Sequence, residues 1–374
     1  MKKYLTLILV FLLCVFTTFS CKKAKATNKT ELTSSENKAP KNIILLIGDG
    51  MGLSQVSASQ FYNNEKSNFD RFSIIGLIKT SAHGSLITDS AAAATALASG
   101  VKTYNGAIGV TKDSISVETI VEQISNRGIA TGLIATSSIT HATPASFYAH
   151  VKSRSMYEDI AYFLVNSDID FFAGGGLKFF NKRKDKKDLI AQLKRNGFDV
   201  NTSVLPQNIL SNPPSRQPRK QAILLAEDEM PKMNEGRGDF LPNATKLALE
   251  VLSKNENGFF LMIEGSQIDW GGHANDSDYL ISELLDFDKT IGLVLDFAIQ
   301  NGETLVIVTA DHETGGFTLS NDGGNYNKIK PTFSTKGHSA TLIPVFAEGP
   351  SASLFGGIYE NTAVYTKMIS LFSE

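Results

Sequence analysis

The stretch Ile43-Ile44-Leu45-Leu46-Ile47-Gly48-Asp49-Gly50 decides the fold of this chain. Its apolar run predicts a buried strand, and the glycines predict a tight turn that presents one carboxylate. Two later segments repeat the pattern of an apolar run followed by acids and histidines. They are Phe259 to Glu264, leading to Asp269 and His273, and Leu305 to Thr309, leading to Asp311 and His312. Because the carboxyl ends of parallel strands meet at one edge of an open sheet, these side chains predict a metal site there.

Strand and helix patterns alternate along the chain from Lys41 onward. This alternation predicts an α/β fold, a three-layer sandwich in which helices cover both faces of a mostly parallel central sheet. The predicted strands are 42–47, 74–80, 131–136, 169–174, 259–264, 304–310 and 343–348. The predicted helices are 53–64, 90–99, 116–127, 155–166, 185–196, 243–253, 277–300 and 361–372.

One predicted helix and one irregular stretch carry more detailed expectations. The helix predicted over 116–127 has an apolar stripe at spacings of three and four, with Ser116 expected to cap its start and Gly128 expected to end it. The stretch 176–240 is less regular and contains several prolines. Its part 200–240 is expected to be an excursion over the edge of the sheet.

The first residues predict export. Residues 1–20 combine a charged start with an apolar stretch that is short for a membrane span, as in a signal peptide. Cys21 follows directly, so we expect a lipoprotein-type signal with Cys21 lipidated, and plain secretion is the alternative. Residues 21–40 are polar and are expected to form a flexible tether to a domain over 41–374. The expected location is the periplasm or the cell surface, with membrane contact only through the anchor.

Composition narrows the class of protein. The chain has 374 residues, of which 42% are hydrophobic, so it can form a sizeable core, and its net charge of -2 gives no sign of nucleic-acid binding. The basic run 182–187 is interrupted by Asp185 and is expected to be a solvated helix face. Beyond Cys21 the chain has no cysteine, so its stability depends on the core and on metals rather than on disulfides.

Ser90 lies in Thr88-Asp89-Ser90-Ala91-Ala92, at the start of an alanine-rich helix pattern. Simple capping of the helix by Asp89 or Ser90 would explain the pattern. The amides at a helix start also attract anions, so a phosphate ester can sit over Ser90. A free hydroxyl is a weak nucleophile, and no G-x-S-x-G elbow surrounds this serine, so activation by a metal is the favoured route.

The histidines strengthen the metal prediction jointly. Asp269 and His273 are four residues apart, which places them on one side of a helical turn, and His338 precedes the strand predicted at 343–348. Each of these patterns alone is common on protein surfaces. Three of the chain's six histidines, His273, His312 and His338, nevertheless fall at these places, which favours one shared site.

With these motifs in view, the chain from Lys41 to its end resembles the alkaline phosphatase family. Thr88 to Ala92 matches the family's nucleophile motif, Thr309-Ala310-Asp311-His312 its strand-end metal motif, and Glu264 to His273 its E-G-x-x-I-D-x-x-x-H segment. Ala142-Thr143-Pro144-Ala145 and His150-Val151-Lys152-Ser153-Arg154 match the stretch that carries its phosphate-binding arginine.

The resemblance implies two Zn²⁺ and one Mg²⁺ per subunit. Asp269, His273 and His338 would hold the first zinc. Asp49, Asp311 and His312 would hold the second, with Ser90 bound to it as an alkoxide. Asp49, Thr143 and Glu264 would hold magnesium, and Arg154 would bind two phosphate oxygens.

His141 and Trp270 depart from the best-known bacterial members, which carry an aspartate and a lysine near the magnesium. The pair resembles a bacterial subgroup that includes cold-adapted enzymes. A histidine and an indole beside the ligands are expected to change magnesium occupancy.

The reaction that the resemblance implies is hydrolysis of phosphate monoesters in two in-line displacements through a phosphoserine on Ser90, in a homodimer. The alternatives within enzymes are a phosphodiesterase or a sulfatase of the same superfamily. Sulfatases need a C/S-x-P-x-R setting that Ser90 lacks, and diesterases usually lack the third metal site and the arginine. A non-catalytic metal- or phosphate-binding lipoprotein is the other alternative, and it would need no nucleophile.

Overall fold

The computed structural model describes residues 39–206 and 220–372, all within a unit that runs from Glu36 to Glu374. The predicted signal peptide, the predicted lipidation site at Cys21 and nearly all of the predicted tether lie outside the described residues. Of the helices in these two ranges, none has both the length and the apolar character that crossing a membrane requires.

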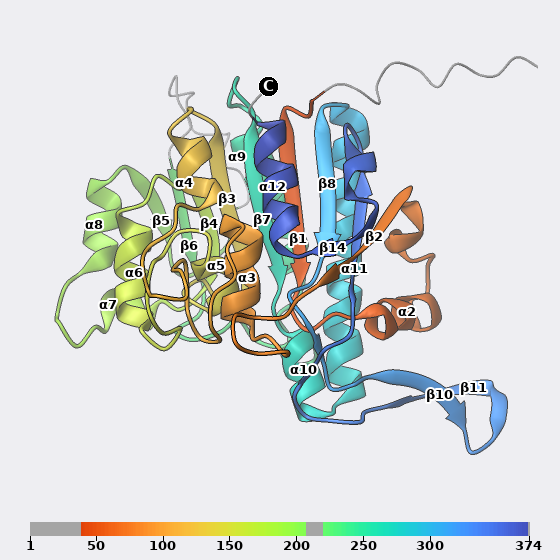
Figure 1. The fold of residues 1–374 in the computed structure, drawn as a ribbon. Coiled ribbons are helices and arrows are strands. Elements are labelled where there is room, and N and C mark those ends of the chain that lie inside the picture. The colour runs from red at the N-terminus through yellow and green to blue at the C-terminus, as the bar shows by residue number, and fades with distance from the viewer. Residues whose placement is uncertain (1–38, 207–219, 373–374) are drawn as a thin grey trace, which may run out of the picture. The chain divides into compact units, whose positions relative to one another are not determined.

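The strand that begins at Asn42 lies inside a large sheet. In the described part of the chain ten strands form this sheet, in the order β14-β2-β13-β8-β1-β7-β3-β4-β6-β5 (Figure 1). Their bounds are β1 Asn42–Gly48, β2 Ile74–Lys79, β3 Ala130–Ser138, β4 Phe171–Gly175, β5 Phe198–Asn201, β6 Lys220–Leu224, β7 Phe259–Gly265, β8 Thr304–Thr309, β13 Ile343–Glu348 and β14 Gly357–Glu360. β1 pairs in parallel with β7 and β8, while β13 runs antiparallel to β2 and β8. The predicted mostly parallel sheet is confirmed.

Helices cover both faces of this sheet, which confirms the predicted three-layer α/β sandwich. α3 (Ser90–Ser99) contacts α4 (Ile120–Ser125) and α12 (Thr362–Leu371) in front of the sheet, and α9 (Phe240–Leu252) packs against α11 (Ser277–Asn301) behind it (Figure 1). The other α-helices of the described residues are α2 Leu53–Tyr62, α5 Ala142–Ala145, α6 Tyr157–Val165, α7 Lys178–Asn181, α8 Leu189–Arg195 and α10 Ile268–Ala274.

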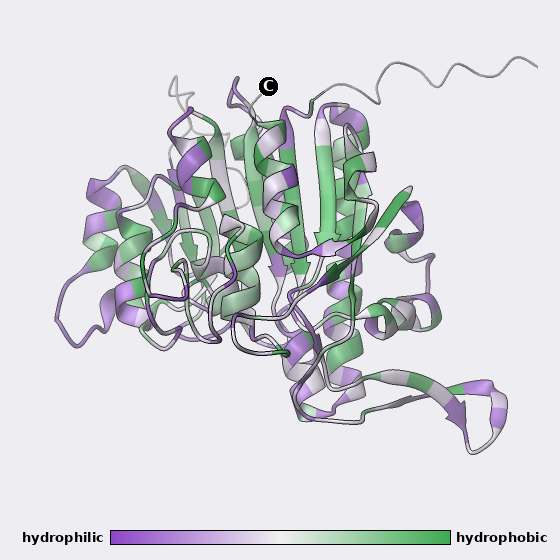
Figure 2. Ribbon diagram, viewed as in Figure 1, coloured by the Kyte–Doolittle hydropathy of each residue, from purple (hydrophilic) through white to green (hydrophobic). Residues whose placement is uncertain are grey.

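The core lies between these layers. Figure 2 shows the central strands as almost continuously hydrophobic, and the side chains of Ile43 to Ile47 have no exposed surface. A strand covered by helices on both faces needs apolar residues at every position, which explains the unbroken run. Each such buried side chain contributes about 1.5–3 kcal/mol to the free energy of folding.

The prediction that Ser116 caps a helix over 116–127 is wrong. α4 begins at Ile120, and its cap is Thr119, whose side chain accepts a hydrogen bond from the Glu122 amide while the Glu122 carboxylate accepts one from the Thr119 amide. This reciprocal capping satisfies two amides that would otherwise lack partners. Ser116 instead forms an isolated bridge with Val110, and Gly128 follows the helix end with a φ of +73°.

The stretch 176–240 is more regular than its sequence pattern indicates. It contributes α7, α8 and two strands, β5 and β6, which extend the sheet in parallel beyond β4. These strands have four and five residues, too few for a clear hydrophobic alternation.

Two further pairs of strands, absent from the prediction, follow β8. β10 (Thr318–Asp322) and β11 (Asn325–Thr332) form a hairpin that extends away from the sheet (Figure 1). β9 (Glu313–Thr314) pairs with β12 (His338–Ser339), with His338 opposite Thr314. This short pair brings His338 back to the end of β8.

Candidate active site

The carboxyl ends of β1, β7 and β8 form the floor of the site. Ile47 of β1 lies opposite both Glu264 of β7 and Thr309 of β8, so Asp49, Glu264 and Asp311 emerge at the same edge of the sheet. α10 follows β7 at this edge, below the strand ends in Figure 1. The parallel register therefore brings Glu264 and Asp311 to Asp49, although both are far from it along the chain.

Asp269, His273 and His338 form a first group whose ligand atoms all lie within 4.8 Å of one another. The Nδ1 atoms of the two histidines face backbone carbonyls, His273 toward Lys336 and His338 toward Thr88 at 2.8 Å. A carbonyl only accepts, so each Nδ1 carries the proton and each Nε2 keeps a lone pair. The two Nε2 atoms are 3.2 Å apart and face each other, an arrangement that a cation between them explains.

Asp49, Asp311 and His312 form a second group with the same spacing limit. His312 Nε2 lies 3.2 Å from Asp311 Oδ2 and 3.7 Å from Asp49 Oδ1, and all three side chains are buried. Both carboxylate oxygens of Asp49, and Oδ2 of Asp311, have no hydrogen-bond partner. Because burying an unpaired carboxylate is costly, this set of orphaned oxygens fits a divalent cation.

Burial also shapes the protonation of this group. It raises the pKa of Asp49, an effect that the neighbouring charge of Asp311 reinforces, and it lowers the pKa of His312 to about 3. His312 is therefore neutral at physiological pH and offers Nε2 as a ligand.

A third group consists of Asp49, His141 and Glu264. Glu264 Oε1, Thr143 Oγ1 and His141 Nδ1 are buried without hydrogen-bond partners, and burial raises the pKa of Glu264 to about 8. These oxygens again fit a cation. His141 was expected to lie beside the ligands of this group, and the structure places it within the group itself. Burial, followed by the charge of Arg154, lowers the pKa of His141 to about 3.

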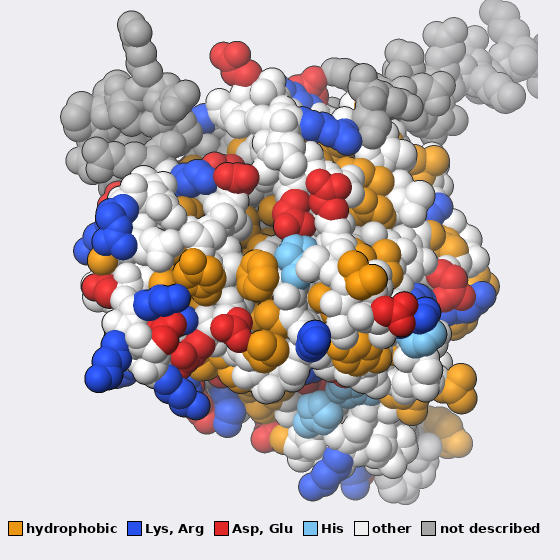
Figure 3. Space-filling model, turned by 60° about the vertical axis from the view of Figure 1, so that its left-hand side comes forward, with side chains coloured by type: hydrophobic (Ala, Val, Ile, Leu, Met, Phe, Trp, Pro, Cys, Tyr) orange, Lys and Arg blue, Asp and Glu red, His pale blue; other side chains and the backbone are white. Residues whose placement is uncertain are grey.

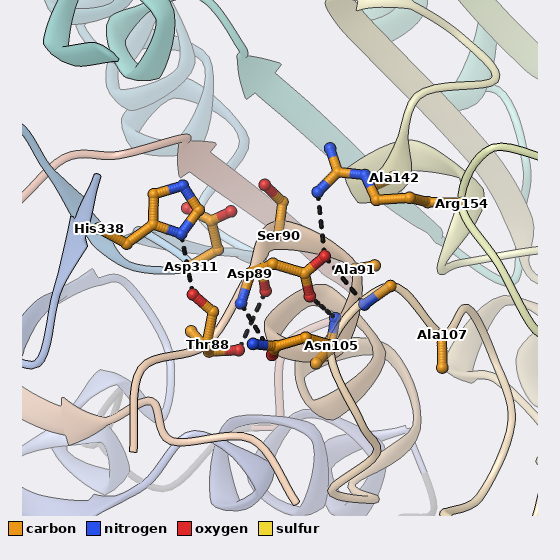
Figure 4. Close-up of polar contacts among 12 residues, drawn as sticks. Thr88, Asp89, Ser90, Ala91, Asn105, Ala107, Ala142, Arg154, Asp311 and His338 are labelled. Carbon is orange, nitrogen blue, oxygen red and sulfur yellow. Dashed lines mark hydrogen bonds and ion pairs between the residues drawn. The ribbon is translucent and has the colours of Figure 1, made fainter. Parts of the chain in front are cut away.

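Ser90 is the first residue of α3 and lies at the second group. Its Oγ is 3.3 Å from His312 Nε2, and the residue is 2% exposed. Asp89 caps the helix by accepting a hydrogen bond from the Ala92 amide. Capping by Asp89 therefore leaves the Ser90 hydroxyl available to the metal ligands (Figure 4).

Arg154 reaches the same place from a distant loop. Its Nη1 donates to Asp89 Oδ2 at 3.1 Å (Figure 4). Its Nη2 donates to His141 Nε2 at 3.1 Å. The two oxygens of Asp89 thus serve different partners, Ala92 through Oδ1 and Arg154 through Oδ2. Sequence reasoning missed this second role because the two residues are 65 positions apart and nothing local marks them as a pair.

The Arg154 contact also determines the tautomer of His141. Nε2 accepts from the guanidinium, so Nδ1 carries the proton of the neutral ring and is a donor without an acceptor. Trp270, the other departure noted above, packs edge-on against this ring with centroids 5.8 Å apart. In this arrangement His141 offers a nearby cation a proton rather than a lone pair.

All predicted site residues therefore converge at one edge of the sheet, with Trp270 touching the site through His141. The first group is the more open one, since His273 is exposed and His338 is half-buried while the second group is buried. Figure 3 shows histidine side chains at the surface. On the face in view, acidic and basic side chains are interspersed. The first group is thus accessible to solvent, whereas Ser90 lies with the buried second group.

Comparisons with known proteins agree with this geometry. A family model described as alkaline phosphatase matches residues 40–333. Alkaline phosphatase 3 of Bacillus subtilis (strain 168) is 42% identical over 301 residues, which cover 76% of this chain and 63% of that protein. The alkaline phosphatase of Escherichia coli (strain K12) is 31% identical over 411 residues, covering 90% and 86%. The chain thus spans slightly less than two thirds of the first relative and most of the second.

Solved structures give the same result. The alkaline phosphatase from the Antarctic bacterium TAB5 is 55% identical with a TM-score of 0.87, and the match covers 90% of this chain and 99% of that one. Two variants of that enzyme, in which a histidine is replaced by aspartate or glutamate, have Mg bound in the M3 site and match with 54% identity and a TM-score of 0.86. The resemblance read from the motifs is confirmed.

Proposed function

This chain belongs to the alkaline phosphatase family, whose members are metal-dependent phosphomonoester hydrolases, and on that premise we propose that it hydrolyses phosphate monoesters with Ser90 as the nucleophile. The observation that carries the proposal is the position of Ser90 Oγ, 3.3 Å from His312 Nε2, among buried carboxylate oxygens that lack partners. A serine that merely capped α3 would not need this surrounding, because Asp89 already caps the helix.

We assign two Zn²⁺ and one Mg²⁺ to the three groups. The first two groups combine imidazole nitrogens with carboxylates, which suits zinc, and the third is mainly oxygen, with Asp49, Thr143 and Glu264, which suits magnesium. When bound, these cations supply the charge that favours the serine alkoxide and the phosphate oxygens of the transition state.

The side chains then perform two in-line displacements. Ser90 Oγ attacks phosphorus while its proton passes to water. The bond between phosphorus and the ester oxygen breaks, the departing alkoxide takes up a proton from water and leaves as the alcohol, and a phosphoserine remains. The guanidinium of Arg154 can bind two non-bridging oxygens of the phosphate in bidentate fashion. Asp89 accepts a hydrogen bond from this guanidinium and holds it near Ser90 (Figure 4). A water molecule next attacks the phosphoserine from the face that the alcohol has left, which releases inorganic phosphate and restores Ser90.

A comparison of three substrates tests the reaction class. We expect p-nitrophenyl phosphate to react faster than bis(p-nitrophenyl) phosphate and p-nitrophenyl sulfate by at least about two orders of magnitude, because Arg154 and the third group favour a dianionic monoester. The release of p-nitrophenol measures all three. A faster diester or sulfate reaction would show that the phosphodiesterase or sulfatase alternative is right, and no turnover of any ester would favour a passive binding protein.

The third group yields a prediction about magnesium. The substitution His141→Asp is expected to raise magnesium content toward one ion per chain, because a carboxylate replaces a ring that offers a proton. Elemental analysis after equilibration at limiting Mg²⁺ measures the difference, and His141→Asn is the matched control without charge. Equal magnesium in the wild type and the aspartate variant would contradict the assignment of this group.

We also propose that the protein is exported, with lipidation at Cys21, that it acts on phosphate esters outside the cytoplasm, and that it is a homodimer. The signal-like residues 1–20 followed by Cys21 support the first part, and family membership supports the second and third. Cell fractionation of the full chain and its Cys21→Ala variant, together with sedimentation of the purified protein, decides these points.

A further inference from the structure

Outside the metal groups, His150 has an unusual pair of partners. Its Nδ1 lies 2.7 Å from the carbonyl oxygen of Gly109, and its Nε2 lies 2.9 Å from Glu122 Oε1. A carbonyl and a carboxylate only accept hydrogen bonds, so both ring nitrogens have to donate. A neutral imidazole has a single N–H, and the geometry therefore requires the doubly protonated, cationic ring.

The surroundings of the ring are simple. Among the described residues, the titratable group that faces it is Glu122 of α4, while α6 contributes the edge of Phe163 and the adjoining loop contributes the Gly109 carbonyl. The His150 side chain is 10% exposed, so solvent screens the ion pair only partly. Glu122 is itself fixed, because its other oxygen accepts the Thr119 amide in the cap of α4.

A short ladder of hydrogen bonds connects His150 to Arg154. The backbones of Ile108 and Val151 exchange two hydrogen bonds of 3.0 and 2.9 Å, and the Arg154 amide donates to Gly106 at 2.7 Å. His150 is tied to Gly109 at one end of this ladder, and Arg154 leaves from the other. A displacement of the His150 end is therefore transmitted along two paired segments to the base of the Arg154 side chain.

Two details show that this ladder is closely fitted. Gly109 has a φ of +57°, and a Cβ on it would lie 2.0 Å from the Ala149 carbonyl oxygen, so only glycine permits the approach. At the far end, the Gly106 amide donates to Asp89 Oδ2, the same oxygen that binds Arg154. The ladder thus supports both the arginine and the carboxylate that orients it.

We propose that His150 is a positioning residue for phosphate binding, whose imidazolium joins Glu122 and Gly109 to the segment that carries Arg154, and that loss of its proton weakens the hold of Arg154 on phosphate. This inference rests on the proposed role of Arg154 in phosphate binding. It adds that phosphate binding depends on the protonation of His150.

The direction of the pH effect follows from the contacts. Burial lowers the pKa of His150, but the hydrogen bonds to Glu122 and Gly109 outweigh it and raise the pKa above the ordinary value. A raised pKa means that the pair is intact below the ordinary histidine value and is lost as pH rises through the raised one. Phosphate affinity should therefore fall on the alkaline side of that pKa, in addition to any change at the metal groups.

A direct test reads the charge of His150 without using activity. In the metal-loaded full chain labelled with ¹⁵N-histidine, the signals of His150 are identified by their absence in His150→Gln. We expect both ring nitrogens to be protonated at about pH 6.5, with an apparent pKa above the ordinary value of about 6.5. A ring that is neutral at this pH would overturn the inference.

Inhibition by inorganic phosphate tests the consequence. At about pH 7, His150→Gln is expected to raise the inhibition constant roughly three- to tenfold and to change kcat by less than about twofold, since a positioning contact is lost while the nucleophile stays. As pH rises, the wild-type constant should approach that of the variant, because both then lack the imidazolium. Inhibition constants that are equal across the pH range, or a loss of kcat alone, would overturn the inference.

Three further variants make the result specific. Glu122→Gln keeps the size of the partner and should raise the inhibition constant in the same direction, while His83→Gln, at an exposed histidine, should change nothing. Metal content and thermal midpoint are measured for each variant, so that a folding defect is recognised. Arg154→Ala tests the premise, because unchanged phosphate inhibition in that variant would contradict the role of Arg154 while leaving the measured charge of His150 intact.

Discussion

The Ser90→Ala variant is expected to lose at least about a thousandfold in kcat toward p-nitrophenyl phosphate, because no phosphoserine can form and water must attack the ester without that intermediate. Its content of zinc and magnesium should match that of the wild type, since Ser90 is a minor ligand beside Asp49, Asp311 and His312. Steady-state turnover and elemental analysis on the same preparation measure both quantities.

Ser99 provides a matched control within the same helix. It is a buried serine of α3 whose hydroxyl donates to the Thr95 carbonyl at 2.7 Å, away from the metal groups. Ser99→Ala should keep kcat within about twofold of the wild type, because the loss of one internal hydrogen bond affects stability rather than chemistry. Turnover of Ser90→Ala at the wild-type rate would refute the assignment of the nucleophile.

Removal of the metals is the second change with a large expected effect. Exhaustive chelation should reduce activity by at least about a hundredfold, and Zn²⁺ together with Mg²⁺ should restore it. The thermal midpoint should fall by several degrees, because ions that bind only the folded state stabilise it. In the stripped protein four buried oxygens have neither an ion nor a donor beside them: both carboxylate oxygens of Asp49, Oε1 of Glu264 and Oδ2 of Asp311.

Separate additions make this experiment specific. Zn²⁺ alone should restore most of the activity, since the first two groups contain the histidines and adjoin Ser90, and Mg²⁺ alone should restore little. Unchanged activity after chelation, with metals shown to be absent by elemental analysis, would contradict the whole mechanism. Recovery by Mg²⁺ alone would contradict the assignment of zinc to the histidine groups.

The histidine beside the arginine links these results. His141 accepts from Arg154 through Nε2, so the residue beside the proposed magnesium site also contacts the side chain proposed to bind phosphate. The His141→Asp substitution should therefore alter both properties, since a carboxylate would attract Arg154 as well as magnesium. Measuring phosphate inhibition in that variant separates the two effects.

Features that depend on neighbouring residues in the chain could be predicted from the sequence. The apolar run before Asp49 predicts a buried strand, because a strand that helices cover on both faces needs an apolar side chain at every position. Asp269 and His273 predict one face of a helical turn, and α10 places them so. Such features depend on spacing along the chain, and this is why candidate metal ligands could be proposed residue by residue from the sequence.

Other features depend on partners that are far apart in the chain. The contact of Asp89 with Arg154, the strand β5 at the edge of the sheet and the start of α4 at Ile120 were all missed. Ser116 and Thr119 both have side chains that can cap a helix. Thr119 is the cap of α4, and its hydroxyl also donates a hydrogen bond to the Phe147 carbonyl, a contact that depends on the tertiary fold. Local pattern leaves such choices open because one capping side chain contributes only about 1 kcal/mol.

The amino-acid sequence by itself determined the fold class, the family and the types of ligand, because the hydrophobic period and the order of acids and histidines are properties of short segments. Only the tertiary structure decided which nitrogen of each histidine carries a proton, for that depends on the acceptor that folding places against it. His150 faces two acceptors, His141 faces a donor, and the rings of His273 and His338 each turn one nitrogen to a carbonyl. These proton positions follow from contacts made across the whole chain, which no short segment contains.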